Sequence, residues 1–166
     1  MTAQRQNPNP GRAAAVLGTI ILAVALGTAR MALAGLTQQI VIDWRTGLAI
    51  DGYDPVAFFT DGAPVLGSAD LELRYAGAVW RFRNVGNRAA FADRPDVYMP
   101  RYGGYDPVDI ARGVAVAGNP TIWTIADQRL YLFYDDTRRE KFLADTGRYV
   151  AAAERKWPLV SGALDP

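Results

Sequence analysis

Cysteine and histidine are both absent from the 166 residues of the chain. Without cysteine, the protein can form no disulfide, no thiolate nucleophile and no cysteine-ligated zinc or iron–sulfur centre. Without histidine, it lacks the commonest general base and the usual haem and copper ligand, and a serine hydrolase triad is excluded for the same reason. We therefore expect no catalysis and no cofactor.

Charge of one sign is also lacking, because 18 Lys and Arg residues nearly balance 17 Asp and Glu residues and leave a formal net charge of +1. Proteins that bind nucleic acid usually carry a strong basic excess. We therefore expect no nucleic-acid partner. The small basic cluster at Arg138, Arg139 and Lys141 is typical of the solvated face of a helix.

The N-terminal segment contains the one long apolar run. A polar leader over residues 1–12 carries Arg5 and Arg12, and residues 13–29 then contain no charged side chain. As a helix, this run would span roughly 26 Å, which suits either a signal peptide or a membrane anchor. The apolar positions of this predicted hydrophobic helix are Ala13, Val16, Leu17, Ile20, Ile21, Leu22, Val24 and Leu26.

Two fates of this helix stay open. Ala32 and Ala34 place small residues at the positions that signal peptidase accepts, so cleavage near Ala34 would release the chain. Retention of the helix would instead leave an anchor over residues 13–29. In both cases Arg5 and Arg12 favour the cytoplasmic side, so we expect the remainder at the extracytoplasmic, periplasmic face of the cytoplasmic membrane.

The remainder contains an internal repeat. The motif GYDPV occupies residues 52–56 and returns at residues 104–108. Downstream, residues 80–82 (WRF) correspond to residues 131–133 (YLF) at an offset of 51, and a single-residue deletion reconciles this offset with the offset of 52 between the motifs. Phe91 and Tyr98 likewise correspond to Phe142 and Tyr149. The shared spacing indicates a duplication.

Each copy predicts the same local structure. Asp54-Pro55 and Asp106-Pro107 fit a helix N-cap followed by proline at the first helical position, and Gly62 and Gly113 suit the ends of these short helices. Alternating apolar residues then predict a β-hairpin in each copy, with turns over residues 76–78 and 126–129.

A helical segment is expected after each hairpin. The first includes residues 87–91 and ends before Arg94-Pro95. In the second copy, Thr137 and Glu140 have the spacing of a capping box. A last helix is expected over about residues 147–157, with Pro158 closing it.

The first copy contains three spaced motifs, Asp54-Pro55-Val56, Tyr75-x-Gly77-x-x-Trp80-x-Phe82 and Phe91-x-x-x-Pro95-x-x-Tyr98. They resemble those of a YHS domain, and most closely those of exported YHS-domain proteins. The resemblance covers about residues 51–158 and implies an α+β fold. We expect two tandem YHS-like units, each with a short helix, a β-hairpin and a helix, packed together and preceded by the hydrophobic helix.

The metal role of some YHS relatives is not expected here. Their cysteine positions fall on Arg83 and Asn87 in this chain, and residues 102–105 (YGGY), which cysteine often follows in exported relatives, are followed by Asp106. None of these three residues is a soft-metal ligand. Carboxylates could hold a hard cation, although their spacing favours structural roles as caps and turn residues and we expect no metal. The candidates are Asp51, Asp54, Asp61, Asp135 and Asp136.

The junction between the copies is the candidate binding segment. Tyr102 and Tyr105 flank Gly103 and Gly104 and precede Asp106, and we expect both tyrosines to reach the surface. Tyrosine is a common interface anchor because it buries a large area at a low cost in entropy. A linker turn between the copies is the structural alternative.

The sequence thus divides into five ranges. They are a leader with signal peptide or anchor (1–34), a linker or possible strand (35–50), the first YHS-like repeat (51–102), the second (103–158) and a tail (159–166). The favoured function is a membrane-tethered, non-enzymatic accessory or interaction subunit of a membrane complex. It would bind protein partners and, if the leader is retained, the lipid bilayer.

Two other functions remain open. The chain could instead be a cleaved periplasmic or secreted binding protein for a small ligand or a hard cation. An enzyme that uses acids alone is the least favoured class, because nothing in the sequence places two carboxylates across a cleft.

Overall fold

The computed structural model describes Met1 and residues 40–164 of the chain. The leader, the hydrophobic helix over residues 13–29 and the cleavage site near Ala34 lie outside the described residues. From Ile40 on, the described residues belong to one compact unit, Gly35–Pro166. No helix in this described part is both long enough and apolar enough to cross a membrane.

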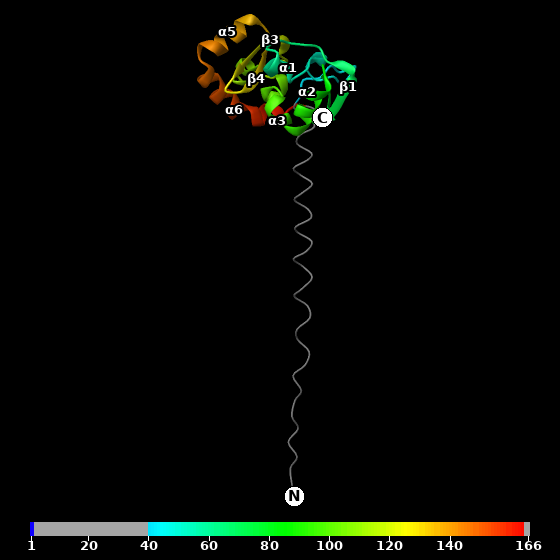
Figure 1. Ribbon diagram of the computed structural model, residues 1–166. Coiled ribbons are helices and arrows are strands. Elements are labelled where there is room, and N and C mark those ends of the chain that lie inside the picture. The colour runs from blue at the N-terminus through cyan, green and yellow to red at the C-terminus, as the bar shows by residue number, and fades with distance from the viewer. Residues whose placement is uncertain (2–39, 165–166) are drawn as a thin grey trace. The chain divides into compact units, whose positions relative to one another are not determined.

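Short helices alternate with two antiparallel hairpins, which confirms the predicted α+β class (Figure 1). In chain order the elements are η1 (Ile50–Gly52), α1 (Ala57–Thr60), β1 (Ser68–Tyr75), β2 (Ala78–Phe82), α2 (Val85–Asp93), α3 (Pro95–Tyr98), η2 (Arg101–Gly104), α4 (Pro107–Ile110), β3 (Asn119–Ala126), β4 (Arg129–Phe133), α5 (Asp136–Ala144) and α6 (Thr146–Gly162).

Each hairpin is a separate two-stranded sheet, β1 with β2 and β3 with β4. The turns are shorter than predicted, with only Ala76–Gly77 and Asp127–Gln128 between the paired strands. All four turn residues have positive φ, between 49° and 78°. Two successive residues of positive φ make the turn whose twist matches that of the flanking strands.

Equivalent features recur 51 residues apart. The irregular pairing between Ser68 and Glu72 in the first hairpin returns between Asn119 and Trp123 in the second. The elements of the two series have matching lengths up to the last helix, which is longer in the second. The first series starts at Ser68, Ala78, Val85 and Pro95, and the second at Asn119, Arg129, Asp136 and Thr146.

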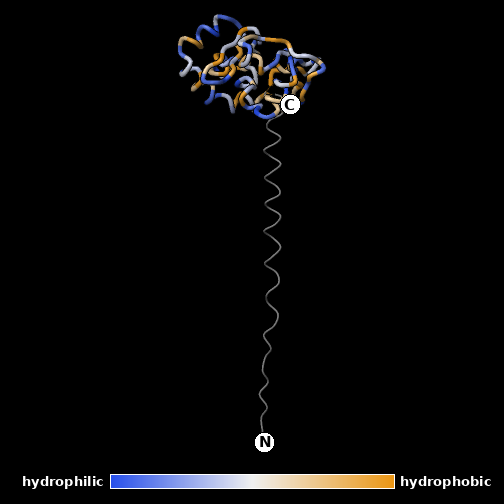
Figure 2. Tube along the Cα trace, in the orientation of Figure 1, coloured by the Kyte–Doolittle hydropathy of each residue, from blue (hydrophilic) through white to orange (hydrophobic). Residues whose placement is uncertain are grey.

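Two hydrophobic clusters fill the interior, and β4 lies between them. Leu130 and Leu132 belong to the cluster built mainly by η1, β2 and α2, whereas Tyr131 and Phe133 belong to the cluster formed with α4, α5 and α6. Because successive side chains of a strand point to opposite faces, one strand can serve both clusters. In Figure 2 the apolar stretches are accordingly interleaved with polar ones along the folded unit.

A phenylalanine on the helix after each hairpin organises the aromatic core. The ring of Phe91 lies 5.0 Å from that of Trp80 and 5.2 Å from that of Phe82, measured between ring centroids. Phe142 repeats this arrangement, with ring distances of 4.9 Å to Tyr131 and 5.2 Å to Phe133. The aromatic residues that share an offset in the sequence therefore share a packing role.

Residues 40–49, expected as part of a linker or a strand, form a loop held against the first hairpin. Ile42 and Ala49 make an isolated antiparallel bridge, and Leu48 makes a parallel one with Val79. The loop also reaches the middle of the chain, because the Val41 amide donates to the carbonyl of Gly103 at 2.8 Å.

Two predicted helix boundaries in the second half are wrong. The cap of α5 is Asp135, whose side chain accepts from the Arg138 amide, and Thr137 lies inside the helix. The last helix does not end at Pro158 but continues to Gly162. Val160 and Ser161 are buried on this continuation, and their packing offsets the hydrogen bond that Pro158 cannot donate.

Glycine is required where the chain passes β2 and β4. A Cβ atom on Gly67 would lie 2.4 Å from the carbonyl carbon of Arg81, and one on Gly118 would lie 2.6 Å from the Cβ of Leu132. These separations are far below any van der Waals contact. The backbone itself therefore has to approach the neighbouring strand.

We predict that G67A and G118A each lower the free energy of unfolding by about 1–3 kcal/mol, as overpacking typically does. G147A is the matched control, because a Cβ there meets no atom within 4 Å. Since alanine is the better helix former, G147A should be neutral or stabilising by up to about 1 kcal/mol. Urea unfolding of the full chain in mild detergent, followed by tryptophan fluorescence, measures all three. Equal stability of the three variants would contradict the close approach.

Candidate functional site

Asp106 is fully buried and joins three segments of the second half of the unit. One carboxylate oxygen accepts from the amides of Val108 at 2.8 Å and Asp109 at 3.4 Å, which caps α4. The other oxygen accepts from the amide of Tyr134, directly after β4, at 2.8 Å. The expected N-cap role of Asp106 is thus confirmed, and the same side chain also fixes the end of the hairpin.

Asp54 has the equivalent place in the first half and is equally buried. Its carboxylate accepts from the amide of Val56 at 2.9 Å and from that of Arg83, directly after β2, at 2.8 Å. The side-chain amide of Asn87 on α2 donates a third hydrogen bond at 2.7 Å. Helix α1 starts only at Ala57, so Asp54 caps a turn that precedes the helix rather than the helix itself.

Arg138 takes the place in the second half that Asn87 has in the first, 51 residues earlier. Its Nε donates to Asp109 at 2.6 Å and lies 3.9 Å from the carboxylate of Asp106. A terminal nitrogen pairs with Asp135, and the guanidinium lies over the ring of Tyr134 at 5.0 Å. Burial raises the pKa of Asp106, and the neighbouring Asp109 adds to this effect.

The predicted binding segment, residues 102–106, is mostly inside the protein. Tyr102 is only 4% exposed, and Gly103, Gly104 and Asp106 are buried as well. Tyr105 is half-buried. The expectation that Tyr102 reaches the surface is therefore wrong.

Helix α6 is the reason for this burial. Trp157 lies 5.6 Å from the ring of Tyr102 and 6.1 Å from that of Tyr105, and Tyr131 contacts Tyr102 from β4. The Tyr102 hydroxyl donates to Glu154 at 3.3 Å. Burial raises the pKa of Tyr102 to about 12.

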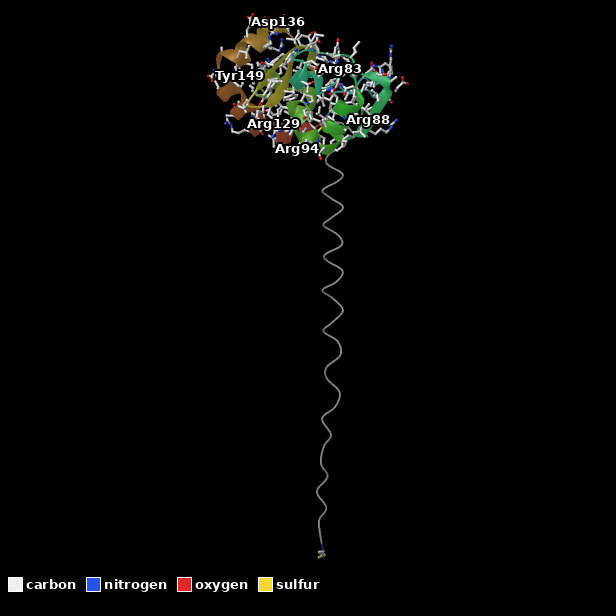
Figure 3. All side chains as sticks on the ribbon, viewed as in Figure 1. Arg83, Arg88, Arg94, Arg129, Asp136 and Tyr149 are labelled. Carbon is white, nitrogen blue, oxygen red and sulfur yellow. The ribbon has the colours of Figure 1, made fainter. Side chains whose placement is uncertain are left out.

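The carboxylates considered for a hard cation do not form a cluster, and several of them are paired with arginine. Asp61 pairs with Arg83, Asp135 with Arg138, and Asp136 with Arg139 at 2.8 Å, while Asp51 is exposed on η1. In the described part of the chain, no three acidic side chains are grouped so as to hold a metal ion. In Figure 3, Asp136 lies at the upper edge of the folded unit, and Arg83 lies lower and further to the right.

Sequence reasoning missed the residues that complete these arrangements. Arg138 was assigned to a solvated face, whereas it contacts two buried carboxylates, and Asn87 and Asp109 were not given a role. The signal that could have found Arg138 and Asn87 is their common offset of 51, which places each beside the aspartate of its own half.

The chemical capacity of this arrangement is limited. Asp54 and Asp106 each accept three hydrogen bonds within the fold. Among the described residues, every buried side-chain nitrogen or oxygen atom has a hydrogen-bond partner. A general base needs a lone pair that faces its substrate, and neither Asp54 nor Asp106 offers one to the solvent.

We predict that Tyr102 limits stability at high pH. Its folded pKa of about 12 exceeds the ordinary value of 10, so the unfolded chain loses this proton first and stability falls as the pH rises from 10 to 12. Y102F should remove this part of the alkaline loss while costing about 0.5–1.5 kcal/mol near neutrality for the lost hydrogen bond. Melting temperatures of both proteins from pH 8 to 12 test this. Parallel alkaline curves for the two proteins would contradict it.

We predict that R138A is far more destabilising than R139A. The first substitution leaves the buried Asp106 and Asp109 without their main counter-charge, whereas the second breaks an exposed pair on the same helix. Helix propensity cancels between these two arginine-to-alanine changes, so the difference in melting temperature reports the buried network. Similar melting temperatures would show that Arg112 alone, which also pairs with Asp109 at 2.8 Å, compensates Asp109.

Comparison with known proteins does not identify a family for the chain. No family model, no curated protein and no solved structure matches the chain.

Proposed function

We propose that residues 51–158 are two tandem YHS-like units and that the chain serves as a non-enzymatic accessory subunit of a membrane complex at the periplasmic face. The recurrence of elements, hairpin irregularities and aromatic contacts at an offset of 51 supports the tandem arrangement. The sequence motifs of each copy support the YHS-like assignment.

The non-enzymatic part of the proposal depends on one observation. The carboxylates of Asp54 and Asp106 each accept three hydrogen bonds within the fold. These buried carboxylates are the groups on which an acid-based enzyme without histidine or cysteine would rely. Both are used to hold the start of a helical turn to the end of a hairpin. The pattern favours a protein that acts through its surface.

That surface presents several large apolar side chains, as expected for an interaction module. Scattered apolar residues are normal on any protein, so their number decides nothing by itself. Within residues 40–164 the most exposed is Trp44, and the others occur in both halves of the folded unit. They include Leu66, Tyr75, Val85, Tyr134, Leu143 and Leu159.

The tethered part of the proposal depends on the apolar run over residues 13–29, which is long enough for an anchor. A tethered domain meets membrane partners at a high effective concentration, so modest contacts suffice for association. The lipid bilayer and membrane proteins are therefore the proposed partners.

Extraction of the native protein in mild detergent tests the proposal. We expect a full-length chain, by intact mass, that comigrates with a larger assembly whose other members can be identified. A soluble chain that begins at Gly35 and runs alone would overturn the accessory role and favour a periplasmic binding protein.

A matched variant separates cleavage from assembly. A34L removes the small residue that signal peptidase requires at this position. If the native chain is already full length, A34L should change neither its mass nor its assembly. A variant that is longer than the native chain would show that the native leader is removed.

A further inference from the structure

The loop of residues 40–49, here named the Trp44 loop, presents an aromatic side chain to the solvent on a firmly held backbone. Trp44 is 82% exposed, although tryptophan is highly buried in most proteins. Ile42, two residues before it, is 45% exposed. The guanidinium of Arg45 lies over the Trp44 ring, 4.9 Å from its centroid. The tip of the loop therefore combines an apolar ring with a cation.

Hydrogen bonds fix the backbone of this loop. The amide of Asp43 donates to Leu48 at 2.9 Å, and that of Gly47 donates to Asp43 at 2.7 Å. The Asp43 carboxylate accepts from the amides of Arg45 at 2.7 Å and Thr46 at 3.0 Å. Because the backbone is ordered before any contact forms, little conformational entropy is lost when Trp44 binds.

The loop is also joined to the rest of the folded unit on two sides. Ala49 donates to Val79 and Val79 to Gly47, each at 2.9 Å, and Val41 donates to Gly103 at 2.8 Å. The Trp44 loop is therefore an integral part of the folded unit and not a frayed end of the chain. The fold thus keeps the Trp44 backbone in a fixed position while its ring is exposed.

We propose that the Trp44 loop contacts the interfacial region of the bilayer in which residues 13–29 are anchored, with Trp44 at the headgroup level and Arg45 toward anionic lipid. This inference depends on the tethered form of the proposed function. Tryptophan concentrates at membrane–water interfaces because its ring is apolar while its indole N–H keeps a polar partner.

The length of the connecting chain supports a lipid occupant. Ten residues, 30–39, separate the apolar run from Ile40, so even a fully extended connection reaches only about 35 Å. Val41 is the first of the described residues with a hydrogen bond to a distant part of the unit, and it can lie no farther than about this length from the end of the apolar run. Trp44 follows it by three residues. The short connection makes the contact intramolecular, which allows a single aromatic anchor to be effective.

Charge also favours the bilayer. Arg45 at the tip is cationic, and a guanidinium can pair with the phosphates of lipid headgroups. The carboxylate of Asp43, two residues before Arg45, accepts hydrogen bonds from the amides of its own loop. The exposed tip thus presents the Arg45 guanidinium beside the Trp44 ring.

Quenching of tryptophan fluorescence by brominated lipid tests the inference. The full chain is reconstituted in vesicles of brominated phosphatidylcholine with phosphatidylglycerol, and flotation establishes that the chain is anchored. We expect quenching of the wild-type emission relative to vesicles without bromine, and loss of most of this quenching in W44F. Trp44 contacts little of the core, so W44F should fold.

A reporter at another exposed site provides the control. Leu143 on α5 is 54% exposed, and L143W in the W44F background should not restore the quenching. Restored quenching, or equal quenching of the wild type and W44F in floating vesicles, would overturn the inference while leaving the anchor intact, and Trp44 would then be assigned to a protein partner. A chain that does not float would overturn both the anchor and the inference.

Discussion

A buried aspartate in each half holds the described fold together. Asp54 and Asp106 lie at the point where a helical turn begins, and each reaches the first amide after the returning strand of its hairpin. The proline that follows each aspartate has no N–H, so the carboxylate binds the next amide along the chain. Removing a carboxylate from water is costly, and full hydrogen bonding is what makes the position tolerable.

The two halves differ because both faces of β4 are buried, whereas the face of β2 that carries Arg81 is only partly buried. In the first hairpin, Arg81 faces outward and pairs with Glu72 at 2.9 Å. The corresponding residue of the second hairpin is Leu132, which packs into the first cluster beside Leu130. An arginine in that place would be buried without a partner. The first hairpin is thus partly exposed, whereas β4 of the second hairpin lies between the two hydrophobic clusters.

The sequence reveals those features that depend on neighbouring residues. The hairpins follow from alternating side chains, and the cap at Asp106 follows from the chemistry of an aspartate before proline. The burial of Tyr102 depends instead on Trp157, more than fifty residues away, which no local pattern contains. Arg138 was missed for a related reason, because its buried partners Asp106 and Asp109 lie on a distant helix. The expected exposure of Tyr102 is consequently wrong, while most of the elements are predicted correctly.

A hydrogen bond near the start of the described unit links these constraints to the proposed role. Val41 is bonded to Gly103, which belongs to the junction between the halves rather than to an outer strand. A force on the chain at Val41 would therefore act on the segment around η2, which packs against β4. In the proposed tethered form, this bond would place the load at the centre of the folded unit rather than on one hairpin alone.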